Sequence, residues 1–241
     1  MIAKWKYIWL PLAALNWCRG WLKNRLFDMG VWKSVEFEVP VIYVGSLATD
    51  CTIGLSKYVQ DLLGGALYVN KYRLSEYGIE KEESLNYCTK LSEERAFSAS
   101  HKVLGLSEWY QNHPDTSAFI MDGDFARNEI RPHFRVMVMD FKRPFFNDEF
   151  FPIGTLNESK KTAKTADIVV VVETPEKANC DEMENEMRSF LKDGATVFFI
   201  KHSIDSLKSY NSADKIEFIS DRDNFERLIL NILPNANLDS E

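Results

Sequence analysis

Short apolar runs recur through most of the chain, and polar or turn-forming residues separate them. Continuous apolar runs of about this length are typical of strands that a parallel sheet buries on both faces. They predict strands at residues 41–44, 66–69, 118–121, 136–139, 168–172 and 196–200, with a further strand at 215–219. Helices are predicted at residues 58–63, 78–91, 93–110, 176–192 and 223–233. The alternation predicts an α/β fold with a mostly parallel sheet covered by helices.

The N-terminal segment has a different pattern. A helix from Pro11 onward would gather polar and small residues on one face and leave the rest of its surface mostly apolar. The apolar stretch 7–18 is shorter than the roughly 20 residues needed to cross a bilayer. Tryptophan favours the headgroup level, and basic residues favour anionic lipid. The pattern therefore predicts an amphipathic helix in the membrane interface, with these contact residues: Trp5, Trp9, Trp17, Trp21 and Arg25. The alternative is a helix packed on its own domain, with Trp17 and Trp21 in the core.

Charge divides the chain in the same way. The net charge is −7, yet residues 1–27 contain five of the 29 basic residues and no acid, so the remainder has 24 basic against 36 acidic residues. A basic end on an acidic body indicates contact with an anionic surface at that end, and it argues against a nucleic-acid partner. The four cysteines form no CxxC pair and no metal-ligand spacing with the histidines, which is typical of buried or idle thiols in a reduced compartment.

Candidate chemistry follows the first predicted strand, where a strand, a loop and a helix have the layout of a phosphate-binding loop. The motif GxxxxGK[ST] needs glycines for backbone contact, a lysine for phosphate charge and a hydroxyl for the metal. Gly54 and Ser56 keep this frame, but Leu55 stands in the lysine position and Thr49 in that of the first glycine. Asp50 adds a negative charge beside the expected phosphates. The loop therefore lacks the charge that holds a triphosphate.

Five segments occur in a fixed order along the chain. They are 10–45, which leads into the loop; 120–127, Ile-Met-Asp-Gly-Asp-Phe-Ala-Arg; 151–158, Phe-Pro-Ile-Gly-Thr-Leu-Asn-Glu; 166–171, Ala-Asp-Ile-Val-Val-Val; and 219–223, Ile-Ser-Asp-Arg-Asp. In order and spacing they resemble the tetraacyldisaccharide 4'-kinases of lipid A synthesis, whose motifs include Asp-Asp-x-Phe-Gln-His and Leu-Pro-Ala-Gly-Arg-Leu-Arg-Glu. The resemblance implies a P-loop NTPase-like fold and an ATP- and magnesium-dependent kinase, peripheral to the cytoplasmic face of the bacterial inner membrane.

The resemblance also implies roles for individual residues. The nucleotide would contact the loop and one acidic residue beyond it: Thr52, Gly54, Ser56 and Glu80. Asp122 and Asp124 would be the catalytic carboxylates, and Asp122 would also bind the metal. Two alternatives stay open at this point. Asp122 could instead be a strand-end acid that caps the next helix, and the Ser56 hydroxyl could instead cap backbone N–H groups at a helix start.

The sequence departs from the family pattern at charged positions. The second aspartate of the acidic motif aligns with Gly123, the glutamine with Ala126 and the histidine with Arg127. Two arginines of the later motif are replaced by Thr155 and Asn157. Removal of one charge-stabilising donor typically costs roughly a hundredfold to a thousandfold in rate. Several such losses together predict weak or undetectable phosphoryl transfer.

We expect three parts: a membrane-interface segment over 1–34, a P-loop kinase-like core over 35–173 and a reduced C-terminal α/β part over 174–241. The predicted function is that of a membrane-associated binding or accessory protein. Its partners would be an anionic membrane surface or an acylated disaccharide lipid, and the sequence indicates no particular protein partner. The alternative is an active 4'-kinase with ATP and magnesium, whose site is rebuilt from residues such as Asp122, Asp124, Glu80 and Lys71. A structural remnant without a ligand is a third hypothesis.

Overall fold

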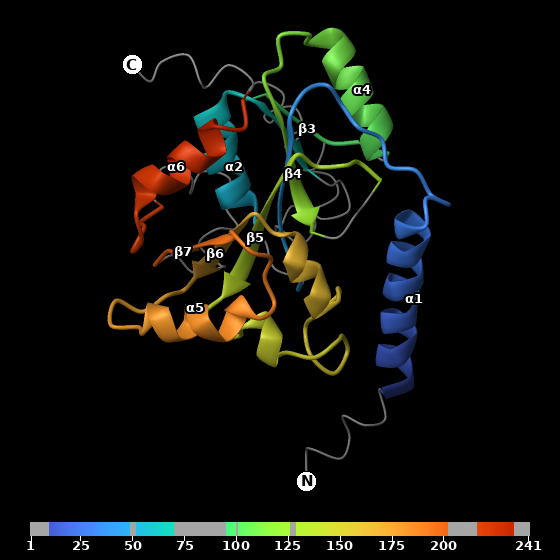
Figure 1. Ribbon diagram of the computed structural model, residues 1–241. Coiled ribbons are helices and arrows are strands. Elements are labelled where there is room, and N and C mark those ends of the chain that lie inside the picture. The colour runs from blue at the N-terminus through green and yellow to red at the C-terminus, as the bar shows by residue number, and fades with distance from the viewer. Residues whose placement is uncertain are drawn as a thin grey trace, which may run out of the picture.

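The computed structural model describes residues 10–48, 52–69, 95–99, 101–125, 129–201 and 216–233. Its centre is a seven-stranded sheet in the order β3-β2-β4-β1-β5-β6-β7, and every pair of neighbours is parallel (Figure 1). The strands are β1 Val41–Ser46, β2 Ala66–Val69, β3 Ala96–Phe97, β4 Phe119–Asp124, β5 Phe134–Asp140, β6 Ile168–Val172 and β7 Thr196–Phe199. The predicted parallel α/β architecture is confirmed.

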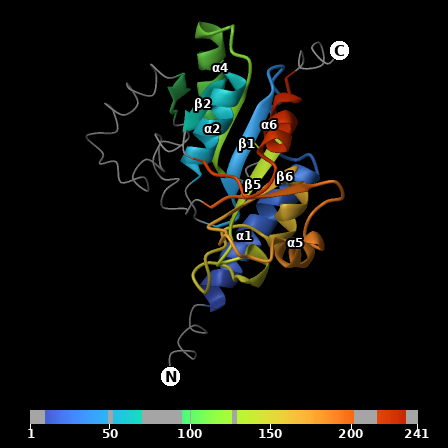
Figure 2. The ribbon, with the colours of Figure 1, turned by 90° about the vertical axis from the view of Figure 1, so that its left-hand side faces the viewer.

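Helices cover both faces of this sheet. They are α1 Leu10–Asp28, α2 Ile53–Leu63, α4 Lys102–Asn112, α5 Cys180–Arg188 and α6 Arg222–Leu230, with short 3₁₀ helices at Phe145–Asn147 and Lys160–Thr165. α2 and α6 pack together on one face, onto which Figure 2 looks, and their apolar side chains join the largest core cluster. α4 and α5 contribute to two further core clusters on the opposite face.

Some predicted boundaries were wrong. The helix expected over 93–110 begins only at Lys102, because Ala96–Phe97 forms β3 beside Leu67 of β2. The expected strand at 215–219 is, in its described part, a single bridge between Ile200 and Phe218. α2 begins before residue 58, and α5 spans less than 176–192. These differences reflect pairing and packing between distant segments, which local sequence pattern does not encode. The helix predicted at 78–91 lies outside the described residues.

β1 marks the point where the direction of chain progression across the sheet reverses. From β1 the chain crosses through α2 to β2 on one side, and β5 later pairs with β1 on the other side. In open parallel sheets, ligands bind at the carboxyl ends of the strands at such a switch point. The backbones of β1 and β4 approach closely here, since a Cβ on Gly45 would lie 2.0 Å from the Gly123 oxygen. The topology therefore places the loop after β1 at the expected ligand edge.

The N-terminal helix α1 lies at the right edge of the molecule in Figure 1, on the side away from α2 and α6. Trp17 is 43% and Trp21 56% exposed, and their rings stack on each other with centroids 6.4 Å apart. The alternative that these tryptophans form core is therefore wrong. Among the described residues, no helix combines the length and apolarity that a membrane span requires. Trp5 and Trp9 precede the described residues, and the interface role of the segment stays a prediction.

The C-terminal part continues the same sheet. β7, which follows Thr174, is the edge strand beside β6, and α6 packs on α2 through the rings of Tyr58 and Phe225. The division expected near residue 174 is therefore not marked by a break in the sheet. The three-part division of the chain stays a prediction.

Candidate phosphate-loop site

Asp122 and two hydroxyls from the start of α2 form the centre of the candidate site. The Asp122 Oδ1 atom lies 2.7 Å from Thr52 Oγ1 and 2.7 Å from Ser56 Oγ, and all three residues are buried. Asp122 comes from β4 and the hydroxyls from the segment after β1, so the neighbouring strands β1 and β4 bring them together. A buried carboxylate requires such donors, because an unpaired buried charge is costly. The structure thus brings together the predicted residues Thr52, Ser56 and Asp122.

These contacts bear on the capping interpretation of the Ser56 hydroxyl. Ser56 Oγ lies near the Thr52 carbonyl oxygen and Asp122, both acceptors, so the hydroxyl donates and does not cap backbone N–H groups. Asp122 accepts from the two hydroxyls of the segment that follows β1. Thr52 is the N-cap residue of α2, but its side chain makes no capping hydrogen bond. The capping alternative for Ser56 is therefore wrong, whereas the one for Asp122 stays a prediction, because residues 126–128 after β4 lie outside the described residues.

Leu55 has become part of the hydrophobic core. It is 0% exposed and belongs to the core cluster between α2 and the sheet. Leu55, Val59 and Leu63 follow at intervals of four residues, which places them on the sheet-facing side of α2. The position that corresponds to the phosphate-binding lysine therefore points into the core in this chain. Lys57 does not replace it, because its ammonium group pairs with Asp61 one turn further along α2.

Gly123 adopts a backbone conformation that restricts its replacement. It stands where the family pattern has the second aspartate, and its φ angle is +131°. Residues with a side chain rarely occupy that region, and they cost of order 1 to 3 kcal/mol there. The loss of the second carboxylate is thus accompanied by a backbone geometry that favours glycine.

The oxygen donors of the site fit one of the two implied ligands. Magnesium prefers oxygen ligands, and the Ser56 hydroxyl with the Asp122 carboxylate would hold such an ion. A triphosphate does not fit position 55, since an apolar buried side chain stands where a cation is needed. The missing attraction between a lysine and a phosphate is substantial, because two opposite charges 4 Å apart attract by about 4 kcal/mol at an effective dielectric constant of 20. No cluster of three or more His, Cys, Asp or Glu side chains suited to a metal occurs among the described residues.

Several other predicted residues are not described. Thr49 and Asp50 of the loop and Lys71 and Glu80 beyond β2 lie outside the described ranges. Asp124 ends β4, but its side chain is not described. Gly54 is buried in the first turn of α2. The roles assigned to all site residues stay predictions.

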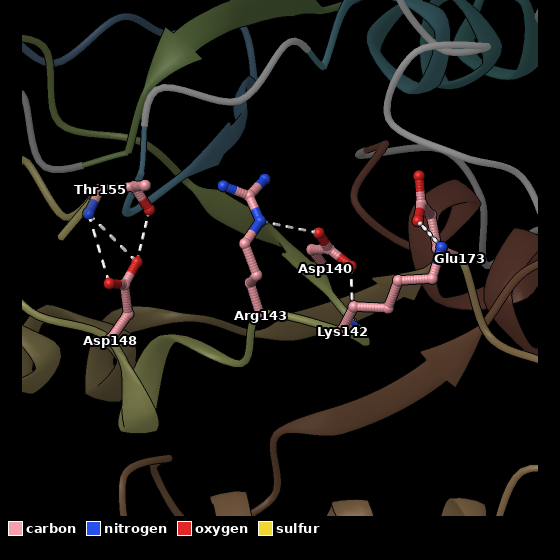
Figure 3. A network of polar contacts seen from close by, with 6 residues as sticks. All are labelled: Asp140, Lys142, Arg143, Asp148, Thr155 and Glu173. Atoms are coloured by element: carbon pink, nitrogen blue, oxygen red, sulfur yellow. Dashed lines mark hydrogen bonds and ion pairs between the residues drawn. The ribbon is translucent and has the colours of Figure 1, made fainter. Parts of the chain in front are cut away.

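A polar network next to the loop was not predicted (Figure 3). Asp140 ends β5, is buried, and accepts hydrogen bonds from the Lys142 backbone N–H at 2.8 Å and from Arg143 Nε at 3.2 Å. The Lys142 ammonium lies 2.7 Å from Glu173, and this hydrogen bond raises the pKa of Lys142. A strand-end acid followed by two basic residues was the sequence signal that could have identified this edge. Arg143 and Asp140 also line a small cavity with Ser46 of β1.

The segment 145–158 supports the start of the phosphate loop. The Leu47 carbonyl oxygen accepts a hydrogen bond from the Asn157 N–H at 2.9 Å, and Ala48 pairs with Leu156 in an antiparallel bridge. Asp148 holds the supporting segment in shape through the Thr155 hydroxyl and backbone N–H (Figure 3). Of the two positions where arginines are replaced, Asn157 therefore contacts the start of the phosphate loop and Thr155 contacts Asp148 within the supporting segment itself.

Comparison with known proteins agrees with this architecture. The crystal structure of LpxK from Aquifex aeolicus in complex with ATP superposes with a TM-score of 0.61 at 22% identity, over 81% of this chain and 64% of that one. The Tetraacyldisaccharide 4'-kinase of Flavobacterium johnsoniae is 25% identical over 205 residues, or 77% of this chain and 59% of the relative. That of Cytophaga hutchinsonii is 26% identical over 208 residues, or 78% of this chain and 58% of the relative.

The parallel sheet, the loop and helix after β1 and the carboxylate on β4 define a P-loop NTPase-like α/β protein. The family model described as Tetraacyldisaccharide-1-P 4'-kinase matches residues 91–220, more than half of the sequence. The chain belongs to this family. It spans little more than half the length of the curated relatives it matches.

Proposed function

We propose that this chain is a divergent 4'-kinase homologue with little or no phosphoryl transfer, which acts as a membrane-associated binding or accessory protein. The observation that carries the proposal is the complete burial of Leu55 in the core. If the lysine had only been lost, one substitution could restore phosphate binding. Here the Leu55 side chain packs between α2 and the sheet, so a lysine cannot replace it without disturbing the core. The positive φ of Gly123 supports the same conclusion for the second carboxylate.

The accessory role is supported by the surface of α1. Leu15, Trp17, Trp21 and Leu22 are between 43% and 64% exposed. Exposed tryptophans beside basic residues are typical of helices that lie in a membrane interface. We infer that α1 holds the protein at the cytoplasmic face of the inner membrane, where the ligand is an acylated disaccharide lipid or the anionic surface itself.

Nucleotide binding and turnover test the proposal together. Equilibrium dialysis with radiolabelled ATP and magnesium measures affinity, and transfer of the γ-phosphate to tetraacyldisaccharide 1-phosphate measures turnover. The Flavobacterium johnsoniae relative, assayed in parallel, shows whether the acceptor lipid and the assay are competent. We expect the relative to transfer phosphate and this chain to show none above a protein-free control. Micromolar ATP affinity with turnover that Asp122→Asn abolishes would refute the proposal.

An active kinase with a rebuilt site is the second candidate. It is favoured by one observation, the Ser56 and Asp122 oxygen pair 2.7 Å apart, which is the donor set a magnesium ion would need. Lys71, Glu80 and Asp124 would then supply the missing groups. Substitution of Lys71 by alanine separates the candidates, because only the rebuilt kinase would lose activity through that change.

A further inference from the structure

A cavity of about 650 Å³ lies where the C-terminal end of α1 meets the body of the protein. Its walls come from the end of α1, the segment after it, the segment before β5, the start of β5 and the end of the second 3₁₀ helix. They include Phe27, Trp32, Lys33, Glu36, Arg131 and Arg135. Cavities of roughly 300 to 1,000 Å³ accommodate small organic ligands. The cavity is therefore large enough for a lipid headgroup.

Backbone hydrogen bonds fix the shape of this cavity. The Val35 N–H donates to the Glu129 oxygen at 2.9 Å, and the Arg131 N–H donates to the Val35 oxygen at 2.8 Å. The Phe27 and Trp32 rings meet edge to face with centroids 5.4 Å apart, which packs the end of α1 against the segment that follows. The segments that line the cavity are thus joined to one another by backbone hydrogen bonds and ring packing.

Positive charge is concentrated in the cavity. Three cationic side chains, Lys33, Arg131 and Arg135, line it together with one acid, Glu36, whereas the whole chain carries −7. Arg131 lies 3.5 Å from Glu36, and Arg135 is held by a 2.7 Å hydrogen bond from Nη1 to the Phe125 oxygen. Burial lowers the pKa of Arg135, but a guanidinium remains charged at neutral pH. The lining favours an anion that can accept several hydrogen bonds, such as a phosphate.

The cavity is separate from the phosphate-loop site. Arg135 precedes Val138 by three residues on β5, and Val138 is the register partner of Ser46 at the end of β1. At about 3.3 Å per residue, the backbone of Arg135 lies roughly 10 Å toward the amino edge of the sheet. Its guanidinium reaches back to the Phe125 oxygen just after β4. The residues that line the cavity include neither Thr52 and Ser56 nor Asp122 of the phosphate-loop site. A ligand in the cavity would therefore be distinct from a nucleotide at the loop.

Exposed apolar side chains adjoin the cavity. Met29 is 56%, Val31 62% and Trp32 47% exposed, and Trp21 is exposed on the preceding helix. Cationic side chains next to exposed apolar ones suit an amphiphile whose anionic head and apolar tail are joined. We infer that this cavity binds the phosphate headgroup of an anionic membrane lipid, whose acyl chains remain in the bilayer beside α1. The inference rests on the proposed membrane association of α1.

Binding of soluble dihexanoyl phosphatidic acid to the full chain tests the cavity without a membrane. Trp32 lines the cavity, so its fluorescence reports binding, and Trp32→Phe should remove the signal. The double variant Lys33→Gln with Arg131→Gln should weaken binding by roughly tenfold or more, since each basic residue near an anionic lipid contributes about fivefold. The matched control Lys177→Gln with Arg227→Gln removes the same charge from exposed positions outside the cavity and should bind like the wild type.

Three results would overturn the inference: equal affinity of the two double variants, equal affinity for dihexanoyl phosphatidylcholine, or equal affinity for inorganic phosphate, which would indicate a free-phosphate site. Sedimentation with vesicles of phosphatidylcholine and phosphatidic acid tests the proposed function separately. Loss of vesicle binding with intact binding of the soluble lipid would refute membrane association while supporting the cavity as a headgroup site.

Discussion

Ser56 Oγ lies 2.7 Å from Asp122 Oδ1, although the two residues are 66 positions apart in the sequence. The contact joins the helix after β1 to the end of β4 and is buried from solvent. It brings together the hydroxyl and the carboxylate to which we assign the proposed magnesium role, and Leu55 stands in the neighbouring lysine position. The site thus contains oxygen atoms of the kind that magnesium prefers, whereas the lysine position has no positive charge.

Removal of the Asp122 carboxylate should destabilise the fold. Asp122→Ala leaves the Thr52 and Ser56 hydroxyls without their shared acceptor, at a cost of about 2 kcal/mol in the free energy of unfolding. Asp122→Asn keeps one oxygen and should cost less. Urea denaturation measures both, and Asp115→Ala, which removes an exposed carboxylate paired with Arg95, should change stability by at most about 0.5 kcal/mol. If Asp122→Ala were more stable than the wild type, the hydrogen bonds from the two hydroxyls would not compensate the cost of burying the Asp122 charge.

Restoring the lysine should fail. Leu55→Lys places an ammonium group among the core side chains of α2 and the sheet, so we expect a loss of about 3 kcal/mol or more in stability and no gain in ATP affinity. The control Leu55→Met keeps volume and apolarity and should cost less than about 1.5 kcal/mol. Thermal unfolding and ATP titration are the measurements. A Leu55→Lys protein that is stable and binds ATP would contradict the proposed function.

Restoring the second carboxylate should also be unfavourable. Gly123→Asp adds a side chain at φ +131°, and we expect a loss of roughly 1 to 3 kcal/mol in the free energy of unfolding. Gly20→Ala serves as a control, because a Cβ there meets no atom within 4 Å and helix α1 has an ordinary backbone at that position. Guanidinium unfolding of the two variants should separate them clearly, and equal stability would argue against backbone strain at Gly123.

Stability should fall at high pH through Tyr58. Burial and the hydrogen bond to Glu226 raise the pKa of Tyr58 to about 12, whereas the unfolded value is 10.0. The folded state therefore keeps the phenol proton between these values, and the stabilisation is complete below pH 10 and is lost as pH rises toward about 12. Because Tyr58 is partly exposed, solvent screening limits the effect to about 1 kcal/mol. Unfolding measured from about one unit below the unfolded pKa of 10.0 up to the folded pKa of about 12 should show this slope in the wild type and not in Tyr58→Phe.

Vesicle binding should depend on the tryptophans of α1. Trp17→Ser with Trp21→Ser removes two exposed rings that belong to none of the three core clusters of the described residues, so we expect weaker sedimentation with anionic vesicles and unchanged thermal stability. Leu104→Ser, an exposed apolar residue of α4, should behave like the wild type. Undiminished vesicle binding of the tryptophan variant would count against a membrane role for α1.

Much of the fold could be predicted from local pattern. The apolar runs around Val44 and Val170 identified buried parallel strands, because strands buried on both faces need no polar alternation. A strand was predicted at 215–219, but its described part forms only a single bridge at Phe218. Local pattern could not predict this, since strand pairing depends on a partner that local sequence does not specify. The two-residue strand at Ala96 was missed for the same reason.

By itself, the sequence determined that the chain has an α/β fold, that Asp122 and Ser56 are candidate ligands, and that position 55 lacks a cation. Only the tertiary structure decided that Leu55 is a core residue and that Ser56 and Asp122 meet. It also brought Lys33, Arg131 and Arg135 to one cavity. The physical reason is that residue type is a local property, whereas burial, charge neighbourhood and hydrogen-bond partners arise from segments that the sheet brings together across long sequence distances.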